Sequence, residues 1–206
     1  LPQATRNELG KLMLRLFFAE VFDLGLVQTD PNFGNYLIND DGSELTLLDF
    51  GSVFELDQTV RRALCNAILA GLINDEARLE TSLVALGCLK SDAGEVAKAT
   101  FKAFINNLLE PLRPPEALQP EHVNAEGLYS WGRSELVNRA SQQVVRSLMN
   151  KEFTIPSGEF AMVARKLTGV FTFIAVLNSE FNGYDIVKPY LDQIAASGGD
   201  RQMSSS

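Results

Sequence analysis

Two short runs of strand-forming residues, at 36–38 and 45–48, most limit how this chain can fold. The turn-forming string N-D-D-G at 39–42 lies between them, and this pattern predicts a β-hairpin. A hairpin brings the residue before its first strand close to the residue after its second strand. We therefore expect Asn35 and Asp49 to lie at the same edge of a small sheet.

Most of the remaining sequence has the apolar spacing of helices. Residues 7–24 form an apolar face that Gly25 is placed to end, and Asp57 is a good N-cap for a helix to about Ile73. Further helices are expected over 75–86, 92–112, 133–150, 157–178 and 184–196. The fold class is therefore mainly α with a small β-hairpin, as a helical bundle. One domain spans 1–197, with the hairpin region at 27–51 and a helical remainder at 57–197, and 198–206 is expected to be a disordered tail.

Two other segments have structural interpretations. The helix expected at 157–178 is apolar almost all round, apart from the pair Arg165-Lys166, and this favours a central core helix over a membrane-facing or lipid-facing one. Tyr129 and Trp131 follow the Pro-rich stretch 113–131, and we expect them to anchor this loop rather than to line a pocket.

Composition excludes several classes of protein. A net charge of −8 argues against a nucleic-acid partner, which requires basic surface. Cys65 and Cys88 have no C-x-x-C spacing and are expected to be core thiols, and the single histidine, His122, makes histidine-based catalysis improbable. The most apolar run, 167–177, is shorter than the roughly 20 residues that span a bilayer. No secretory leader is visible, and the start at Leu1 indicates a part of a longer protein.

The polar strings beside the hairpin have the residue types of a phosphoryl-transfer site. D-P-N-F-G-N at 30–35 has the form D-x-x-x-x-N, and D-F-G occupies 49–51. In kinase-like phosphotransferases the first Asp accepts the proton of the attacking hydroxyl, while the Asn and the D-F-G Asp hold Mg²⁺ on the phosphates of ATP. These roles fall to Asp30 as base and to Asn35 and Asp49 as the Mg²⁺ and nucleotide ligands. Each string alone is also common in turns and caps, so the prediction depends on their combination.

The strings Q-T-D-P-N-F-G-N at 28–35 and L-L-D-F-G at 47–51 closely resemble the UbiB family of atypical kinases, the AarF-domain proteins linked to ubiquinone biosynthesis. F-T-I-P at 153–156 and N-S-E-F-N at 178–182 also look like that family, so the likeness spans most of 8–190. It implies a protein-kinase-like C-lobe that uses ATP and Mg²⁺. It assigns no role to Asn32.

Two departures from ordinary protein kinases shape the functional expectation. No A-P-E anchor follows D-F-G, and the chain enters a helix almost at once, so the expected substrate is a small molecule or lipid, or ATP is simply hydrolysed. The glycine-rich or alanine-rich phosphate loop, the strand Lys and its Glu partner would all precede Leu1. The amino-terminal lobe that carries them is thus an expected partner, and the isolated chain is expected to be inactive.

Two alternatives stay open at this stage. One is a small-molecule kinase of the aminoglycoside phosphotransferase type, against which Gln28 and the D-F-G string argue. The other is a non-catalytic scaffold that binds a membrane or partner and keeps Asp30, Asn35 and Asp49 as remnants. The family likeness implies an intracellular protein, cytoplasmic or organellar, with peripheral contact to a membrane where quinones are made.

Overall fold

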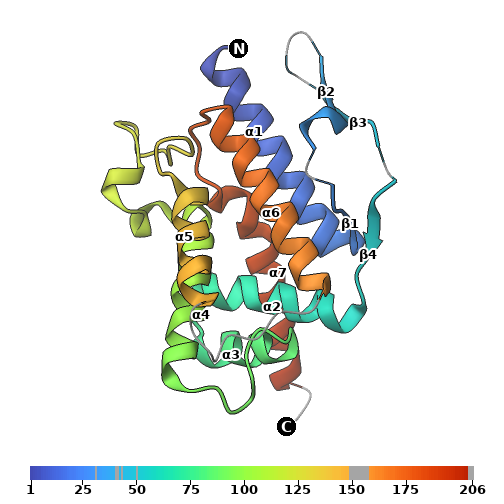
Figure 1. Ribbon diagram of the computed structural model, residues 1–206, viewed down its shortest axis with the longest axis vertical. Helices are drawn as coiled ribbons and strands as arrows, with labels where there is room; N and C mark the ends of the chain where they lie inside the picture. Colours follow the sequence, from blue (N-terminus) through green and yellow to red (C-terminus); the bar gives the residue numbers. More distant parts are fainter. Residues whose placement is uncertain (31, 40–41, 43, 50, 149–157, 204–206) are drawn as a thin grey trace.

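The chain forms a bundle of helices with two small antiparallel sheets along one edge (Figure 1). This computed structural model describes residues 1–30, 32–39, 42, 44–49, 51–148 and 158–203. Its α-helices are α1 (Gln3–Phe18), α2 (Gln58–Ile73), α3 (Glu76–Ala85), α4 (Glu95–Leu108), α5 (Leu136–Leu148), α6 (Gly158–Val176) and α7 (Tyr184–Met203). Its strands are β1 (Leu26–Gln28), β2 (Tyr36–Ile38), β3 (Leu45–Leu47) and β4 (Val53–Glu55). The expected mainly α fold with a β-hairpin is confirmed.

Helices α1 and α6 pack side by side at the centre of the bundle (Figure 1). Their facing side chains are apolar and buried, as the three- and four-residue spacing predicts. Burial of each large apolar side chain contributes about 1.5–3 kcal/mol. The buried residues include Leu9, Met13, Phe17 and Val21 of the α1 region and Val163, Leu167, Val170 and Ile174 of α6. The prediction of a central core helix at 157–178 is therefore confirmed for α6.

The predicted hairpin is present. Strand β2 pairs antiparallel with β3, and Tyr36 lies opposite Leu47. Positions 40, 41 and 43 of its turn lie outside the described residues. A second pair, β1 with β4, places Gln28 opposite Val53. Strand β4 was not predicted, because it pairs with the distant strand β1 and no local turn joins the two. Together the two pairs hold both ends of the segment that carries the polar strings.

The helix termini around the strands use the expected residues. Gly25 adopts a left-handed conformation (φ 68°) after the first helix, and the Asp57 carboxylate accepts two backbone N–H bonds from the first turn of α2. Arg61 of α2 donates to the backbone carbonyls of Val21 and Phe22, the first over 3.1 Å. Arg61 thus satisfies carbonyls at the end of the first helix that have no helical donor.

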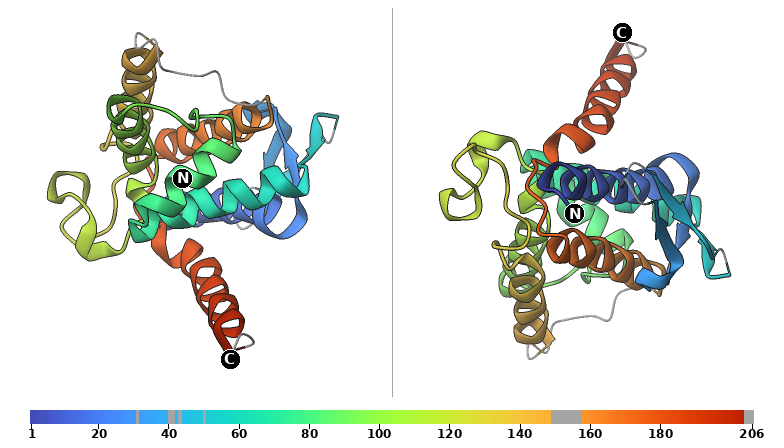
Figure 2. Two further views of the ribbon diagram at one scale, coloured as in Figure 1. Left: turned by 90° about the horizontal axis from the view of Figure 1, so that it is seen from below. Right: turned by 90° about the horizontal axis from the view of Figure 1, so that it is seen from above.

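Some helix limits differ from the prediction. The first helix starts at Gln3, and its last turn, η1 (Ala19–Leu24), is π-helical. Helix α4 ends at Leu108, and a separate 3₁₀ turn, Glu110–Leu112, contains a proline that cannot donate a helical bond. Helix α7 continues to Met203, through 198–203 of the expected tail, and extends away from the bundle (Figure 2). None of the described helices is both long and apolar enough to cross a membrane.

The Pro-rich connection between α4 and α5 is anchored as predicted by Tyr129 and Trp131, which are both buried. The indole Nε1–H of Trp131 donates to the carbonyl of Phe181 over 3.0 Å, and its ring stacks on the Phe181 ring. Cys88 is buried in the core as expected, while Cys65 is half-buried, and burial raises the pKa of Cys65 to about 11.

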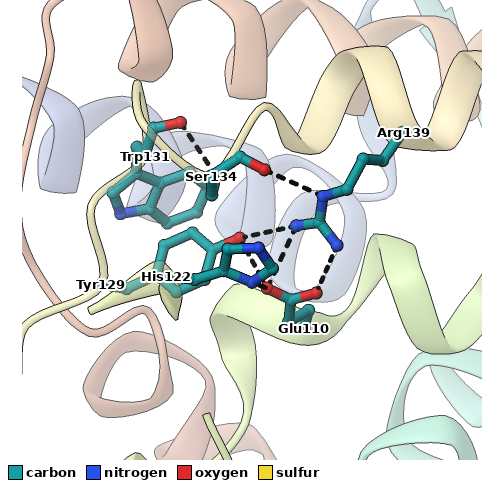
Figure 3. Close-up of polar contacts among 6 residues, drawn as sticks. All are labelled: Glu110, His122, Tyr129, Trp131, Ser134 and Arg139. Atoms are coloured by element: carbon teal, nitrogen blue, oxygen red, sulfur yellow. Dashed lines mark hydrogen bonds and ion pairs between the residues drawn. The ribbon is translucent and has the colours of Figure 1, made fainter. Parts of the chain in front are cut away.

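A buried carboxylate, Glu110, holds the same connection from inside (Figure 3). It accepts two bonds from the Arg139 guanidinium at 2.8 and 3.1 Å and one from the Tyr129 hydroxyl at 3.0 Å, and His122 Nδ1 lies 2.5 Å from it. Burial raises the pKa of Glu110, but the hydrogen bonds and charge of Arg139 outweigh this and lower the pKa below its ordinary value. Because the partners of Glu110 are side chains of the loop and of α5, we interpret the cluster as one that stabilises the loop conformation.

We expect Glu110→Gln to lower the free energy of unfolding by about 2–3 kcal/mol at pH 7, because it removes charge-assisted bonds from a buried site. A folded-state pKa below the unfolded value stabilises the fold above the unfolded pKa, and this contribution is lost as the pH falls through the folded pKa. Urea unfolding at pH 7 and at pH 3 measures the difference between variant and wild type. The difference in unfolding free energy between variant and wild type should be smaller at pH 3 than at pH 7. The exposed Glu121→Gln is the control, and a pH-independent difference would contradict the assignment.

Candidate active site

The loop between β1 and β2 is folded by its own side chains. The Asp30 carboxylate accepts from the backbone N–H of Asn32 at 3.3 Å, and the Asn32 side chain accepts from the N–H of Gly34 at 2.9 Å. A Cβ at Gly34 would lie 3.3 Å from that Asn32 oxygen, so glycine leaves room for the turn. These Asx turns lead into a short 3₁₀ turn at Phe33–Asn35 that brings the chain back toward Asp30.

The structure brings two of the predicted site residues, Asp30 and Asn35, into direct contact. The side-chain nitrogen of Asn35 donates to Oδ2 of Asp30 over 2.8 Å. Asn35 is buried and Asp30 is half-buried. A carboxylate only accepts hydrogen bonds, so this contact assigns the amide nitrogen to Asp30 and turns the amide oxygen elsewhere. The Asn35 side-chain oxygen is therefore the atom that the predicted Mg²⁺ site would use.

The third predicted residue, Asp49, lies at the same end of the hairpin. The backbone carbonyl of Asn35 accepts from the N–H of Leu48 over 2.8 Å, so Asp49 follows directly after the last cross-strand bond. The Asp49 side chain is exposed, and its Oδ1 accepts from the N–H of Gly51 at 2.7 Å. Residues 31 and 50 of the two strings lie outside the described residues. The expected placement at one edge of a sheet is therefore present in the backbone, and the shared metal stays a prediction.

The donor set at this end of the hairpin fits Mg²⁺. A hard cation prefers oxygen ligands, and Asn35 offers an amide oxygen while Asp49 offers a carboxylate. The Gly51 bond uses only one oxygen of that carboxylate. A Cβ at Gly51 would lie 3.0 Å from the same oxygen, so glycine allows the close approach.

Two cavities of the described chain lie away from this loop. One, of about 200 Å³, is lined by side chains of α3 and α4, among them the ion pair Glu80–Lys98 at 2.8 Å. The other, of about 180 Å³, lies among α4, α5 and α6 and is largely apolar, with Phe104, Val137 and Phe171 in its wall. The candidate loop lies outside both.

An ion pair that the sequence analysis did not identify lies beneath the loop. Glu20 and Lys166 are only 4% and 1% exposed, and the Lys166 ammonium lies 3.1 Å from the Glu20 carboxylate. Lys166 was interpreted only as an interruption of an apolar helix. The available signal was that the two residues are opposite charges, each on an otherwise apolar helical face: Glu20 lies three positions after Phe17, and Lys166 lies between Val163 and Val170.

The comparisons with known proteins agree with this fold. A family model described as an ABC1 atypical kinase-like domain matches residues 2–83, which include the whole candidate site. The chain is 27% identical over 178 residues to "Atypical kinase COQ8, mitochondrial" of Schizosaccharomyces pombe, covering 86% of this chain and 28% of that protein. It is 27% identical over 182 residues to "Atypical kinase COQ8B, mitochondrial" of Danio rerio, covering 88% and 27%. The chain thus spans less than a third of either relative.

A solved structure supports the architecture. Rv3197 of Mycobacterium tuberculosis, determined with erythromycin, aligns with a TM-score of 0.61 and 17% identity, covering 91% of this chain and 44% of that chain. The fold is that of a protein-kinase-like carboxyl-terminal lobe. The chain is therefore similar to the ABC1 atypical kinases, and the matched residues 2–83 contain the catalytic-loop and D-F-G strings that indicated this likeness. The F-T-I-P string of that resemblance lies outside the described residues.

Proposed function

We propose that this chain forms the metal-binding and proton-accepting side of a kinase-like active site. The whole protein would use Mg²⁺ and ATP to phosphorylate a small molecule or lipid linked to ubiquinone biosynthesis, or would hydrolyse the ATP. The observation that carries the proposal is the Asn35–Asp30 contact at the open end of the hairpin that also bears Asp49. An amino-terminal lobe would complete the nucleotide site, and peripheral contact with a membrane is part of the proposal.

Each of the three side chains has a distinct role in this proposal. Asp30 accepts the proton of the attacking hydroxyl or water, and the Asn35 amide nitrogen holds its carboxylate in place. The Asn35 oxygen and the Asp49 carboxylate are the protein ligands for Mg²⁺. When bound, Mg-ATP supplies the phosphoryl group, and the cation neutralises charge on the phosphates.

The route of the chain after Asp49 supports a small acceptor. It passes through β4 and enters α2 at Gln58. Protein kinases use a long activation segment at this point to bind a peptide. The short connection favours a small molecule, a lipid or water as acceptor.

We expect Asp49→Asn to weaken Mg-ADP binding by at least about 100-fold in this chain extended upstream by the amino-terminal lobe, because it removes the charged metal ligand. The Asn side chain keeps an oxygen to accept from Gly51, so the turn is retained. Calorimetric titration measures the affinity. Asp57→Asn is the matched control, because Asn also caps a helix and Asp57 lies outside the site.

The same titration tests the division of the site between two lobes. Mg-nucleotide binding by the extended protein, but not by this chain alone, is the expected result. Binding by neither would reject the enzyme proposal in favour of a scaffold. Retained binding by Asp49→Asn would remove Asp49 as a ligand.

A further inference from the structure

The ion pair Glu20–Lys166 lies where three elements meet beneath the candidate loop. Glu20 is on the π-helical turn η1, which Gly25 joins to β1, and Lys166 is on α6. The Lys166 ammonium also donates to the hydroxyl of Tyr36, the first residue of β2, over 3.3 Å. It lies 5.9 Å from the centre of the Tyr36 ring. The pair therefore contacts the strand residue that directly follows Asn35.

The other partner, Glu20, lies on the segment of the chain that leads into the opposite end of the loop. Gly25 joins the end of η1 to β1, and Gln28 is the last residue of that strand. The loop that carries Asp30 and Asn35 runs from Gln28 to Tyr36. The buried ion pair thus connects the Tyr36 end of the loop to α6 and to the turn η1 that leads into β1.

The bonds within the loop set its shape but not its position on the core. Asn35 bonds to Asp30, and Asn32 bonds to Gly34, all within the loop itself. Thr29 adds a bond to the carbonyl of Ser52, which belongs to the same strand region. Phe33 and Tyr36 contact Phe173 of α6 through their rings, and Lys166 of α6 adds a hydrogen bond to the Tyr36 hydroxyl.

The chemistry of the pair also favours positioning over stability. Burial of two charges costs much of the energy that their attraction returns, so an apolar pair of similar volume would stabilise the fold at least as well. Hydrogen bonds from an ion pair are directional, and apolar contacts are not. The π-helical turn that carries Glu20 is a rare form that is often found at functional sites.

We propose that Glu20 and Lys166 are positioning residues that fix the loop of Asp30 and Asn35 against the core. The inference rests on the proposed function for its consequence in metal binding, but its structural part stands without it. Neither side chain is a proposed substrate contact: Lys166 acts through Tyr36, and Glu20 holds the Lys166 ammonium.

The test uses the double variant Glu20→Met/Lys166→Met, which removes the bonds and leaves no unpaired buried charge. Amide hydrogen exchange of the 206-residue chain is read at Thr29, Asn35 and Leu48, whose amides have backbone partners. We expect exchange there to become at least about tenfold faster, while amides of α2 and α6 change less than about twofold. Unchanged exchange in the loop, or equally faster exchange throughout, would overturn the proposal.

A second measurement separates this proposal from the proposed function. Mn²⁺ is titrated as the probe, and its paramagnetic broadening of the Asn35 side-chain signals is followed by NMR. The double variant should bind Mn²⁺ at least about fivefold more weakly than wild type, and Tyr36→Phe should show a smaller effect. If wild type binds no Mn²⁺, the metal site fails in this chain, and hydrogen exchange alone decides the positioning role. Equal Mn²⁺ affinity in wild type and double variant would overturn it.

Discussion

Asp30→Asn should lower turnover by about 10²–10⁴-fold and leave the affinity for Mg-nucleotide within about threefold of wild type. The amide cannot accept the proton of the attacking hydroxyl, and Asp30 is not a proposed metal ligand. Steady-state turnover and calorimetric titration of the extended protein measure the two quantities. Their separation distinguishes a base from a ligand, because loss of a ligand such as Asp49 would weaken both.

The loop geometry requires a control for this variant. The Asp30 carboxylate accepts two bonds, from Asn35 and from the backbone of Asn32, on different oxygens. An Asn at this position has one oxygen and keeps only one of them. Asn32→Ala removes a neighbouring loop bond, to Gly34, without touching the base, and we expect it to cost less than about tenfold in turnover. A similar loss in both variants would assign the effect to loop distortion, and normal turnover in Asp30→Asn would remove the general base.

The hairpin and the helix termini were predictable because their signals are local. The strand-forming runs of β2 and β3 and the N-D-D-G string fix the turn within a few residues. Asp57 and Gly25 mark helix ends through chemistry that acts within one turn. The placement of Asn35 and Asp49 at one end of the hairpin follows from the same local pattern.

Contacts between distant segments were not predictable in the same way. The Asn35–Asp30 bond depends on the loop conformation, which the spacing alone does not define. The partners Glu20 and Lys166 are 146 positions apart, and only the packing of α6 on α1 brings them together. A sequence pattern shows that each charge lies on an apolar face. It does not show which charge will meet which.

Lys166→Met should destabilise the fold by about 4 kcal/mol at pH 7. The variant leaves the Glu20 carboxylate buried without its cation. Protonation of Glu20 costs less free energy than keeping this unpaired charge buried. Burial already raises the pKa of Glu20, and Lys166 is the main opposing influence. Protonation at pH 7 of a carboxyl with an ordinary pKa near 4.3 costs about 4 kcal/mol, and at pH 5 about 1 kcal/mol. Urea unfolding at both pH values measures the cost.

The direction of this pH dependence is the sharpest part of the prediction. In the variant the folded state binds a proton that the unfolded state releases, so its stability relative to wild type falls as the pH rises above the unfolded pKa. Arg165→Met, on the exposed neighbour, is the control and should change stability by less than about 0.5 kcal/mol. Glu20→Met/Lys166→Met should recover most of the loss and show no such pH dependence, because no buried carboxyl remains. A deficit of Lys166→Met that is equal at pH 5 and pH 7 would show that the lost stability comes from packing of the lysine stem rather than from the unpaired charge of Glu20.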